Sequence, residues 1–146
     1  MTAVKWTVLT LALLALAAPI QSSAQQPARG GYIIQHDAEI ARSEPGTHNG
    51  GGQTVGYSFF STVPKLGLIF RKRALKPGSG IGLHQQKEDE IYYVLSGTGT
   101  MTLDGKTVNV TPGIAVLTRT GSSHSLRQTG SDDLVILINY EAAPIQ

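Results

Sequence analysis

The stretch that decides the fold is GSGIGLHQQKEDE, residues 78–90. It places His84, Gln86 and Glu90 at even offsets, ahead of the strand-like run 91–96. Successive side chains of a strand point to opposite faces, so residues of one parity share a face. A histidine, an amide and a carboxylate on one face form part of a metal-binding shell. His124, one or two strands later, is placed to complete it.

The chain around this stretch reads as a series of short strands. Apolar or alternating runs recur after residue 54 and end at Gly, Pro or Asp-Gly. They cover residues 55–61, 66–75, 90–95, 99–103, 107–110, 114–118, 124–128 and 134–140. Asp104-Gly105 is a strong hairpin signal between two of them. Many short strands without a helical period predict an all-β sandwich or barrel.

The N-terminal segment has the features of an export signal. Lys5 precedes the apolar run 6–18, Pro19 follows it, and small residues end at Ala24. This order predicts a signal peptide over residues 1–24, cleaved after Ala24, and hence a periplasmic or secreted protein. The alternative, an uncleaved membrane anchor, fits less well because the apolar run is shorter than the roughly 20 residues that span a bilayer. We therefore expect no membrane contact after cleavage.

Composition limits the remaining possibilities. Residues 25–54 are rich in Gly, Gln, Ser and Pro and predict a flexible arm, whereas residues 55–142 predict one β domain. The chain has 146 residues and no cysteine, which excludes disulfides, thiolate ligands and a cysteine nucleophile. Its formal charge of +2 falls by one when the segment carrying Lys5 is removed, too weak a balance to indicate nucleic-acid binding.

Two motifs resemble those of the small single-domain cupins, the cupin type-2 proteins of the RmlC-like superfamily. The first runs from Gly78 through His84, Gln86 and Glu90 to Gly97. The second runs from Gly113 to residue 128 and keeps the family's glycine at residue 121 and its histidine at residue 124. Three positions depart from the family pattern: residue 86 is Gln where the family has His, residue 119 is Arg for Pro, and residue 128 is Gln for Asn.

The resemblance implies a fold and a metal site. The fold is a double-stranded β-helix, or jelly-roll barrel, of six to eight strands, often paired into dimers through an outer strand. The outward-facing strand 134–140 suits such a homodimer. The site holds one divalent metal, with iron or manganese favoured and nickel, zinc or copper as alternatives. Carried over by position, the ligands are His84, Gln86, Glu90 and His124.

Gln86 leaves three possibilities open. Its amide oxygen is a fourth ligand that is weaker than imidazole, or it does not bind and leaves a further open position, or the metal site has decayed and the cavity binds only a ligand. A further alternative is that His84, Glu90 and His124 are unrelated surface residues. Two histidines and one carboxylate are the ligand set of non-haem iron oxygenases.

Residues near the motifs suggest supporting roles. By parity, Tyr92 and Gln128 are expected to support the ligands Glu90 and His124 through hydrogen bonds. Met101 is expected in the core or in the pocket lining.

Two arginines precede the first motif. Either Arg71 or Arg73 points into the barrel and binds a carboxylate substrate, or both lie on a solvated strand edge. His36 and His48, in the Gly-rich region, are interpreted as solvated residues.

These observations predict an exported mononuclear metal enzyme that acts on a small oxygen-rich or carboxylate substrate. The resemblance favours dioxygenase-type chemistry, and isomerases, decarboxylases and lyases share the same motifs. The alternative is a non-catalytic module that binds a small ligand or sugar beside a weakened metal site.

Overall fold

Ten β-strands make up most of the regular structure in residues 30–142, the part of the chain that the computed structural model describes. They are β1 (Ala41–Pro45), β2 (Gln53–Phe59), β3 (Leu68–Leu75), β4 (Gly80–Gln85), β5 (Glu90–Ser96), β6 (Gly99–Leu103), β7 (Lys106–Val110), β8 (Ala115–Thr118), β9 (Ser123–Gln128) and β10 (Leu134–Glu141). Two short helical turns, α1 (Asp37–Ile40) and η1 (Thr47–Asn49), flank β1. The predicted signal peptide, residues 1–24, lies outside the described residues. Within the described range no helix has the length and apolar character to cross a membrane.

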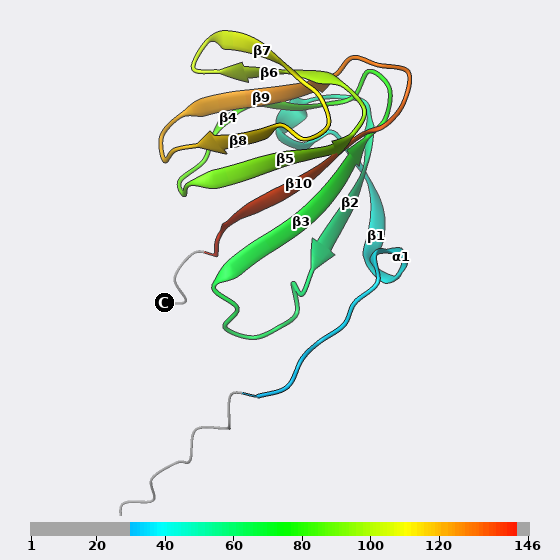
Figure 1. The fold of residues 1–146 in the computed structure, drawn as a ribbon, viewed down its shortest axis with the longest axis vertical. Helices are drawn as coiled ribbons and strands as arrows, with labels where there is room; N and C mark the ends of the chain where they lie inside the picture. Colours follow the sequence, from blue (N-terminus) through cyan, green and yellow to red (C-terminus); the bar gives the residue numbers. More distant parts are fainter. Residues whose placement is uncertain (1–29, 143–146) are drawn as a thin grey trace, which may run out of the picture. The chain divides into compact units, whose positions relative to one another are not determined.

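The strands form two antiparallel sheets that face each other (Figure 1). The six-stranded sheet has the order β1-β2-β3-β10-β5-β8, and the four-stranded sheet has the order β4-β9-β6-β7. This all-β arrangement confirms the jelly-roll barrel expected from the sequence, although it has more strands than the six to eight expected.

Local sequence explains the hairpin between β6 and β7. Leu103 pairs with Lys106, so Asp104 and Gly105 form a two-residue turn. Both turn residues have positive φ, 46° and 82°, the backbone that a type I′ hairpin turn requires. The Asp-Gly signal is therefore confirmed.

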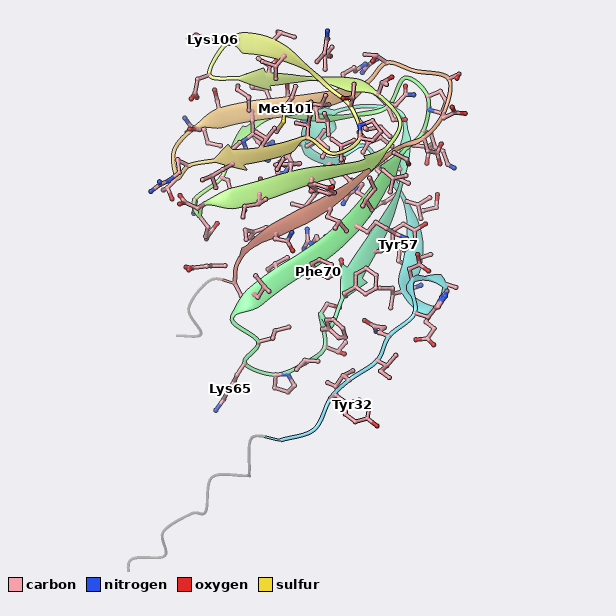
Figure 2. The ribbon with its side chains drawn as sticks, viewed as in Figure 1. Tyr32, Tyr57, Lys65, Phe70, Met101 and Lys106 are labelled. Atoms are coloured by element: carbon pink, nitrogen blue, oxygen red, sulfur yellow. The ribbon has the colours of Figure 1, made fainter. Side chains whose placement is uncertain are left out.

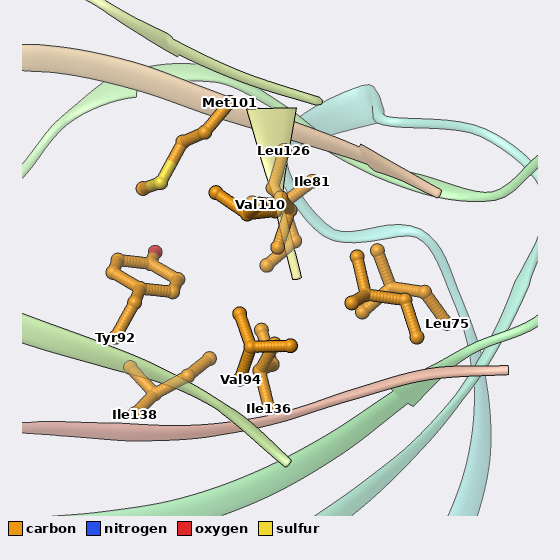
Figure 3. Packing of buried hydrophobic residues seen from close by; sticks show 10 residues of the cluster. Leu75, Ile81, Tyr92, Val94, Met101, Val110, Leu126, Ile136 and Ile138 are labelled. Carbon is orange, nitrogen blue, oxygen red and sulfur yellow. The ribbon is translucent and has the colours of Figure 1, made fainter. Parts of the chain in front are cut away.

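The hydrophobic core lies between the two sheets. Side chains from β4, β6, β7 and β9 meet side chains from β3, β5 and β10 (Figure 3). The buried cluster contains Leu75, Ile81, Tyr92, Val94, Met101, Val110, Leu126, Leu134, Ile136 and Ile138. Figure 2 shows Met101 on the inner side of β6 and Lys106 at the β6–β7 turn. Alternate residues of β5 point inward, as expected for a strand with one buried face.

Two segments differ from their predicted roles. Part of the range predicted as an arm is regular structure, because Ala41–Pro45 pairs with β2 and extends the larger sheet. β10 was expected to be an outward-facing strand, but it lies between β3 and β5. Its Leu134, Ile136 and Ile138 are buried, and only the alternate residues between them face outward.

Candidate metal centre

Two histidines of the smaller sheet lie side by side. His84 on β4 pairs directly with His124 on β9, and directly paired residues share a face of the sheet. Both imidazoles therefore point into the barrel, with ring centroids 4.2 Å apart in an edge-to-face arrangement. His124 is almost fully buried, whereas His84 is half-buried.

Glu90 completes the group from the opposite sheet. It is the first residue of β5, and its Oε2 lies 3.0 Å from Nε2 of His124. Potential ligand atoms of His84, Glu90 and His124 all lie within 4.8 Å of one another. The structure thus brings together three of the four ligands expected from the sequence.

The donor atoms fit a divalent metal. The Nδ1–H of His84 donates to the Gly82 carbonyl at 2.8 Å, and in a neutral ring this leaves Nε2 with a free lone pair. Burial is the main cause that lowers the pKa of His84, which favours this neutral form. Apart from His124 Nε2 at 3.0 Å, which pairs with it only when that imidazole carries a proton there, the buried Glu90 Oε2 has no polar partner among the described residues. A buried carboxylate oxygen in that state is costly unless a cation is close to it.

Gln86 lies just beyond the end of β4. Its backbone carbonyl accepts a hydrogen bond from the Gly121 N–H at 3.1 Å, and the residue lines the same cavity as His84 and Glu90. Gln86 is therefore close to the donor group without being part of the regular strand that carries His84.

Tyr92 lies beside His124, on the inner face that its parity predicted. Its hydroxyl lies 3.1 Å from His124 Nε2, and the residue is 4% exposed. Burial, assisted by the Glu90 carboxylate, raises the pKa of Tyr92 well above its usual value, so the hydroxyl keeps its proton.

Both arginines of β3 point into the barrel. In the register of β3 with β10, Arg71 and Arg73 pair with the inward residues Ile138 and Ile136, and both arginines line the cavity. Arg73 is already paired, since it donates to Thr54 Oγ1 at 2.8 Å and lies 3.2 Å from Glu44 Oε1.

Arg71 is the freer of the two guanidinium groups. It lies over the Tyr140 ring, 5.8 Å from the centroid, and its Nε is buried without a hydrogen-bond partner among the described residues. The described part of the chain also shows no ion pair between Arg71 and a carboxylate. This leaves a half-buried positive charge, with a buried Nε, beside the candidate metal site.

Two predicted supporting residues lie elsewhere. Gln128 accepts from the Gly78 N–H at 2.7 Å and donates to the carbonyls of Gly130 and Asp132 at 2.8 and 2.6 Å. Its side chain therefore ties two loops together, which corrects the expectation that it supports His124. Met101 is 1% exposed and belongs to the core cluster rather than to the cavity lining.

His48 was not expected at the site. It is exposed, as predicted, but its ring stacks on His84 with centroids 3.6 Å apart and planes 6° from parallel. It also lines the cavity. No periodic pattern signals this contact, because His48 belongs to η1 and not to the strands that carry the motifs.

Comparison with known proteins agrees with this geometry. Residues 72–140 match the family model of the cupin domain. An oxalate-binding protein of Thermotoga maritima is 43% identical over 70 residues, which make up 47% of this chain and 58% of the relative. This match therefore spans little more than half the length of that relative.

Solved structures give the same class of fold. The crystal structure of a predicted oxalate decarboxylase from Thermotoga maritima has a TM-score of 0.69 and 30% identity, and the match covers 76% of this chain and 100% of that one. The polyketide cyclase RemF of Streptomyces resistomycificus shares the fold, with a TM-score of 0.64, 18% identity, and coverage of 77% of this chain and 81% of that one. The fold and site define a jelly-roll barrel with a cluster of candidate metal donors on its inner face. The chain belongs to the cupin family.

Proposed function

We propose that this protein binds one divalent metal ion through His84, Glu90 and His124 and, beside that ion, a small dicarboxylate of the oxalate class. Gln86 is the fourth ligand or a hydrogen-bond donor to the bound molecule. The donor set of two imidazoles and one carboxylate suits iron or manganese, with nickel, zinc or copper as alternatives. The observation that carries the proposal is Arg71, whose buried Nε has no hydrogen-bond partner among the described residues and which lines the same cavity as His84 and Glu90.

Charge supports an acidic ligand. A guanidinium group binds a carboxylate through two parallel hydrogen bonds, and such pairs are strong where water is excluded. Arg71 has a buried N–H without a partner among the described residues, whereas Arg73 is occupied by Glu44 and Thr54. A carboxylate at Arg71 supplies the missing acceptor.

Size supports a small ligand. The cavity lined by His84, Gln86, Glu90 and Arg71 has a volume of about 70 Å³. Pockets for drug-sized molecules are typically about 300–1,000 Å³. This cavity therefore suits a compact acid better than a sugar, and two related proteins are described as oxalate-binding and as a predicted oxalate decarboxylase.

Calorimetry with oxalate tests the proposal. Protein freed of metal with a chelator is titrated with Mn²⁺, and the loaded and metal-free forms are then each titrated with oxalate. We expect one Mn²⁺ per chain and oxalate binding to the loaded form alone. Absence of Mn²⁺ binding, or equal oxalate binding by the metal-free form, contradicts the proposal.

Catalysis at the same centre is the second candidate. Three protein donors leave coordination positions open, which favours dioxygenase-type chemistry or a decarboxylase, isomerase or lyase reaction on the bound acid. Oxygen uptake and carbon dioxide release by the Mn²⁺- and Fe²⁺-loaded protein distinguish these reactions from binding alone. Turnover that persists in the chelator-treated protein argues against catalysis by the metal.

We also propose that the mature protein is exported and forms a homodimer. Ile91, Tyr93 and Leu95 of β5 and Leu117 of β8 are exposed on the outer face of the larger sheet, where Ile91 pairs with Leu117. A contiguous apolar face of this kind is typical of a protein–protein contact. Light scattering on wild type and Leu117→Lys tests the dimer, and N-terminal sequencing of the exported form tests cleavage after Ala24.

A further inference from the structure

The imidazole of His84 is held on three sides. The Gly82 carbonyl accepts from its Nδ1–H, His124 lies edge-to-face with it, and His48 covers one of its ring faces. The first two contacts come from the strand pair that carries the metal donors, β4 and β9. The third comes from η1, which lies outside the residues that match the cupin domain.

The backbone of η1 adopts an unusual conformation where the His48 ring stacks on His84. His48 and Asn49 have φ values of 51° and 61°, a left-handed conformation that residues other than glycine adopt rarely and at an energetic cost. Gly82 makes room for this segment, because a Cβ at that position would lie 1.9 Å from the His48 carbonyl oxygen. The left-handed backbone at His48 and its close contact with Gly82 therefore both help to place the His48 ring on His84.

The ring geometry decides whether His48 coordinates the metal or only positions His84. An imidazole nitrogen binds a metal through a lone pair in the plane of its ring. The rings of His48 and His84 are parallel to within 6° with centroids 3.6 Å apart, so the lone pairs of His48 are directed along a plane parallel to that of His84. His48 is therefore badly oriented to bind the ion that His84 binds, and well oriented to fix the His84 ring and cover it from water.

We infer that His48 is a positioning residue of the metal centre, which orients the ligand His84 by ring stacking and does not itself coordinate the metal. This inference rests on the metal centre proposed above. Residues that orient a ligand typically contribute about 10–100-fold to metal affinity. The stacking role requires a flat aromatic ring at residue 48 and does not require a ring nitrogen.

Three variants of the full-length mature protein test this role: His48→Ala, His48→Phe and, as a control, His36→Ala, which changes an exposed histidine that caps α1 at the other end of β1. Affinity is measured from the electron paramagnetic resonance signal of free Mn²⁺. We expect His48→Ala to weaken Mn²⁺ binding by about 10-fold or more. His48→Phe should restore most of the affinity, and His36→Ala should match wild type.

The spectrum of bound Cu²⁺ gives a second readout, since its hyperfine structure reports the number of nitrogen ligands. We expect the same number in wild type and His48→Phe. Loss of one nitrogen in His48→Phe overturns the inference in favour of coordination, and unchanged Mn²⁺ affinity in His48→Ala overturns it outright. If wild type binds no metal at all, the proposed metal centre itself is wrong. Failure of His48→Ala to fold leaves His48→Phe to decide between the two roles.

Discussion

Glu90 and His124 face each other from opposite sheets, with Glu90 Oε2 3.0 Å from His124 Nε2. Both residues are less than 5% exposed, and Glu90 Oε2 has no polar partner other than His124 Nε2 within the described residues. A cation at this point compensates a buried negative charge and joins one sheet to the other. Metal binding should therefore stabilise the barrel as well as form the site.

Glu90→Gln should abolish this stabilisation. Ligand present at 100 times its Kd stabilises a folded protein by about 2.7 kcal/mol. We expect Mn²⁺ to raise the melting temperature of the wild type and to leave that of Glu90→Gln almost unchanged. Differential scanning calorimetry of the metal-free and loaded forms measures both.

The control for this substitution is Glu88→Gln, which removes a nearby carboxylate outside the donor group. This variant should keep the full response to Mn²⁺. A loss of response in Glu88→Gln, or a normal response in Glu90→Gln, contradicts the assignment of Glu90 as the carboxylate ligand.

Motif spacing explains why much of this site could be predicted from sequence. The first motif indicated that His84 and Glu90 lie near each other, and the second motif added His124. Alternation along one strand does not account for the first pair, because His84 is on β4 and Glu90 is on β5 of the opposite sheet. The structure brings ligand atoms of all three within 4.8 Å. The sequence did not decide whether one of Arg71 and Arg73 points into the barrel or both lie on a solvated strand edge. The pairing of β3 with β10 places both inside the barrel.

Contacts that depend on position along a strand or on loop packing could not be predicted in this way. Gln128 shares the inward parity of His124, but four residues of strand separate them by about 13 Å at 3.3 Å per residue. Its amide therefore meets loop carbonyls. The contact of His48 with His84 arises from backbone packing between η1 and Gly82, for which the alternation of side chains carries no signal.

Gln86→His should tighten the binding of Ni²⁺, Zn²⁺ and Cu²⁺. Gln86 lines the donor cavity, and imidazole is a better donor than an amide oxygen for these ions. We expect a gain of roughly 1.4 kcal/mol, which corresponds to a tenfold lower Kd. Competition against a metal-sensitive dye measures the change, and weaker binding by the variant means that Gln86 has a more specific role than filling a coordination position.

Arg71→Gln should weaken oxalate binding without weakening metal binding. Hydrogen bonds to charged groups contribute about 1.5–3 kcal/mol each, so the affinity for oxalate should fall at least tenfold. The matched control is Lys72→Gln, because Lys72 lies next in β3 and forms its ion pair with Asp37 outside the cavity. Calorimetry of the Mn²⁺-loaded variants provides the comparison. Equal oxalate affinity in Arg71→Gln and wild type excludes Arg71 as the carboxylate-binding group.

The metal-free protein should lose stability as the pH falls below about 6.5. Burial is the main cause that lowers the pKa of both His84 and His48 from the usual value of 6.5. As the pH falls from 6.5, the unfolded chain takes up protons that the folded chain does not yet bind, so the free energy of unfolding decreases. Asp37 and Asp89, whose pKa values are lowered mainly by hydrogen bonds from Lys72 and Thr120, add a similar loss only below about pH 3.8.

Urea unfolding in the presence of a chelator between pH 7 and about 5 therefore measures the contribution of the histidines without that of the aspartates. His84→Gln should show a shallower decrease than wild type, and an equal slope in the two proteins would show that His84 is not the source.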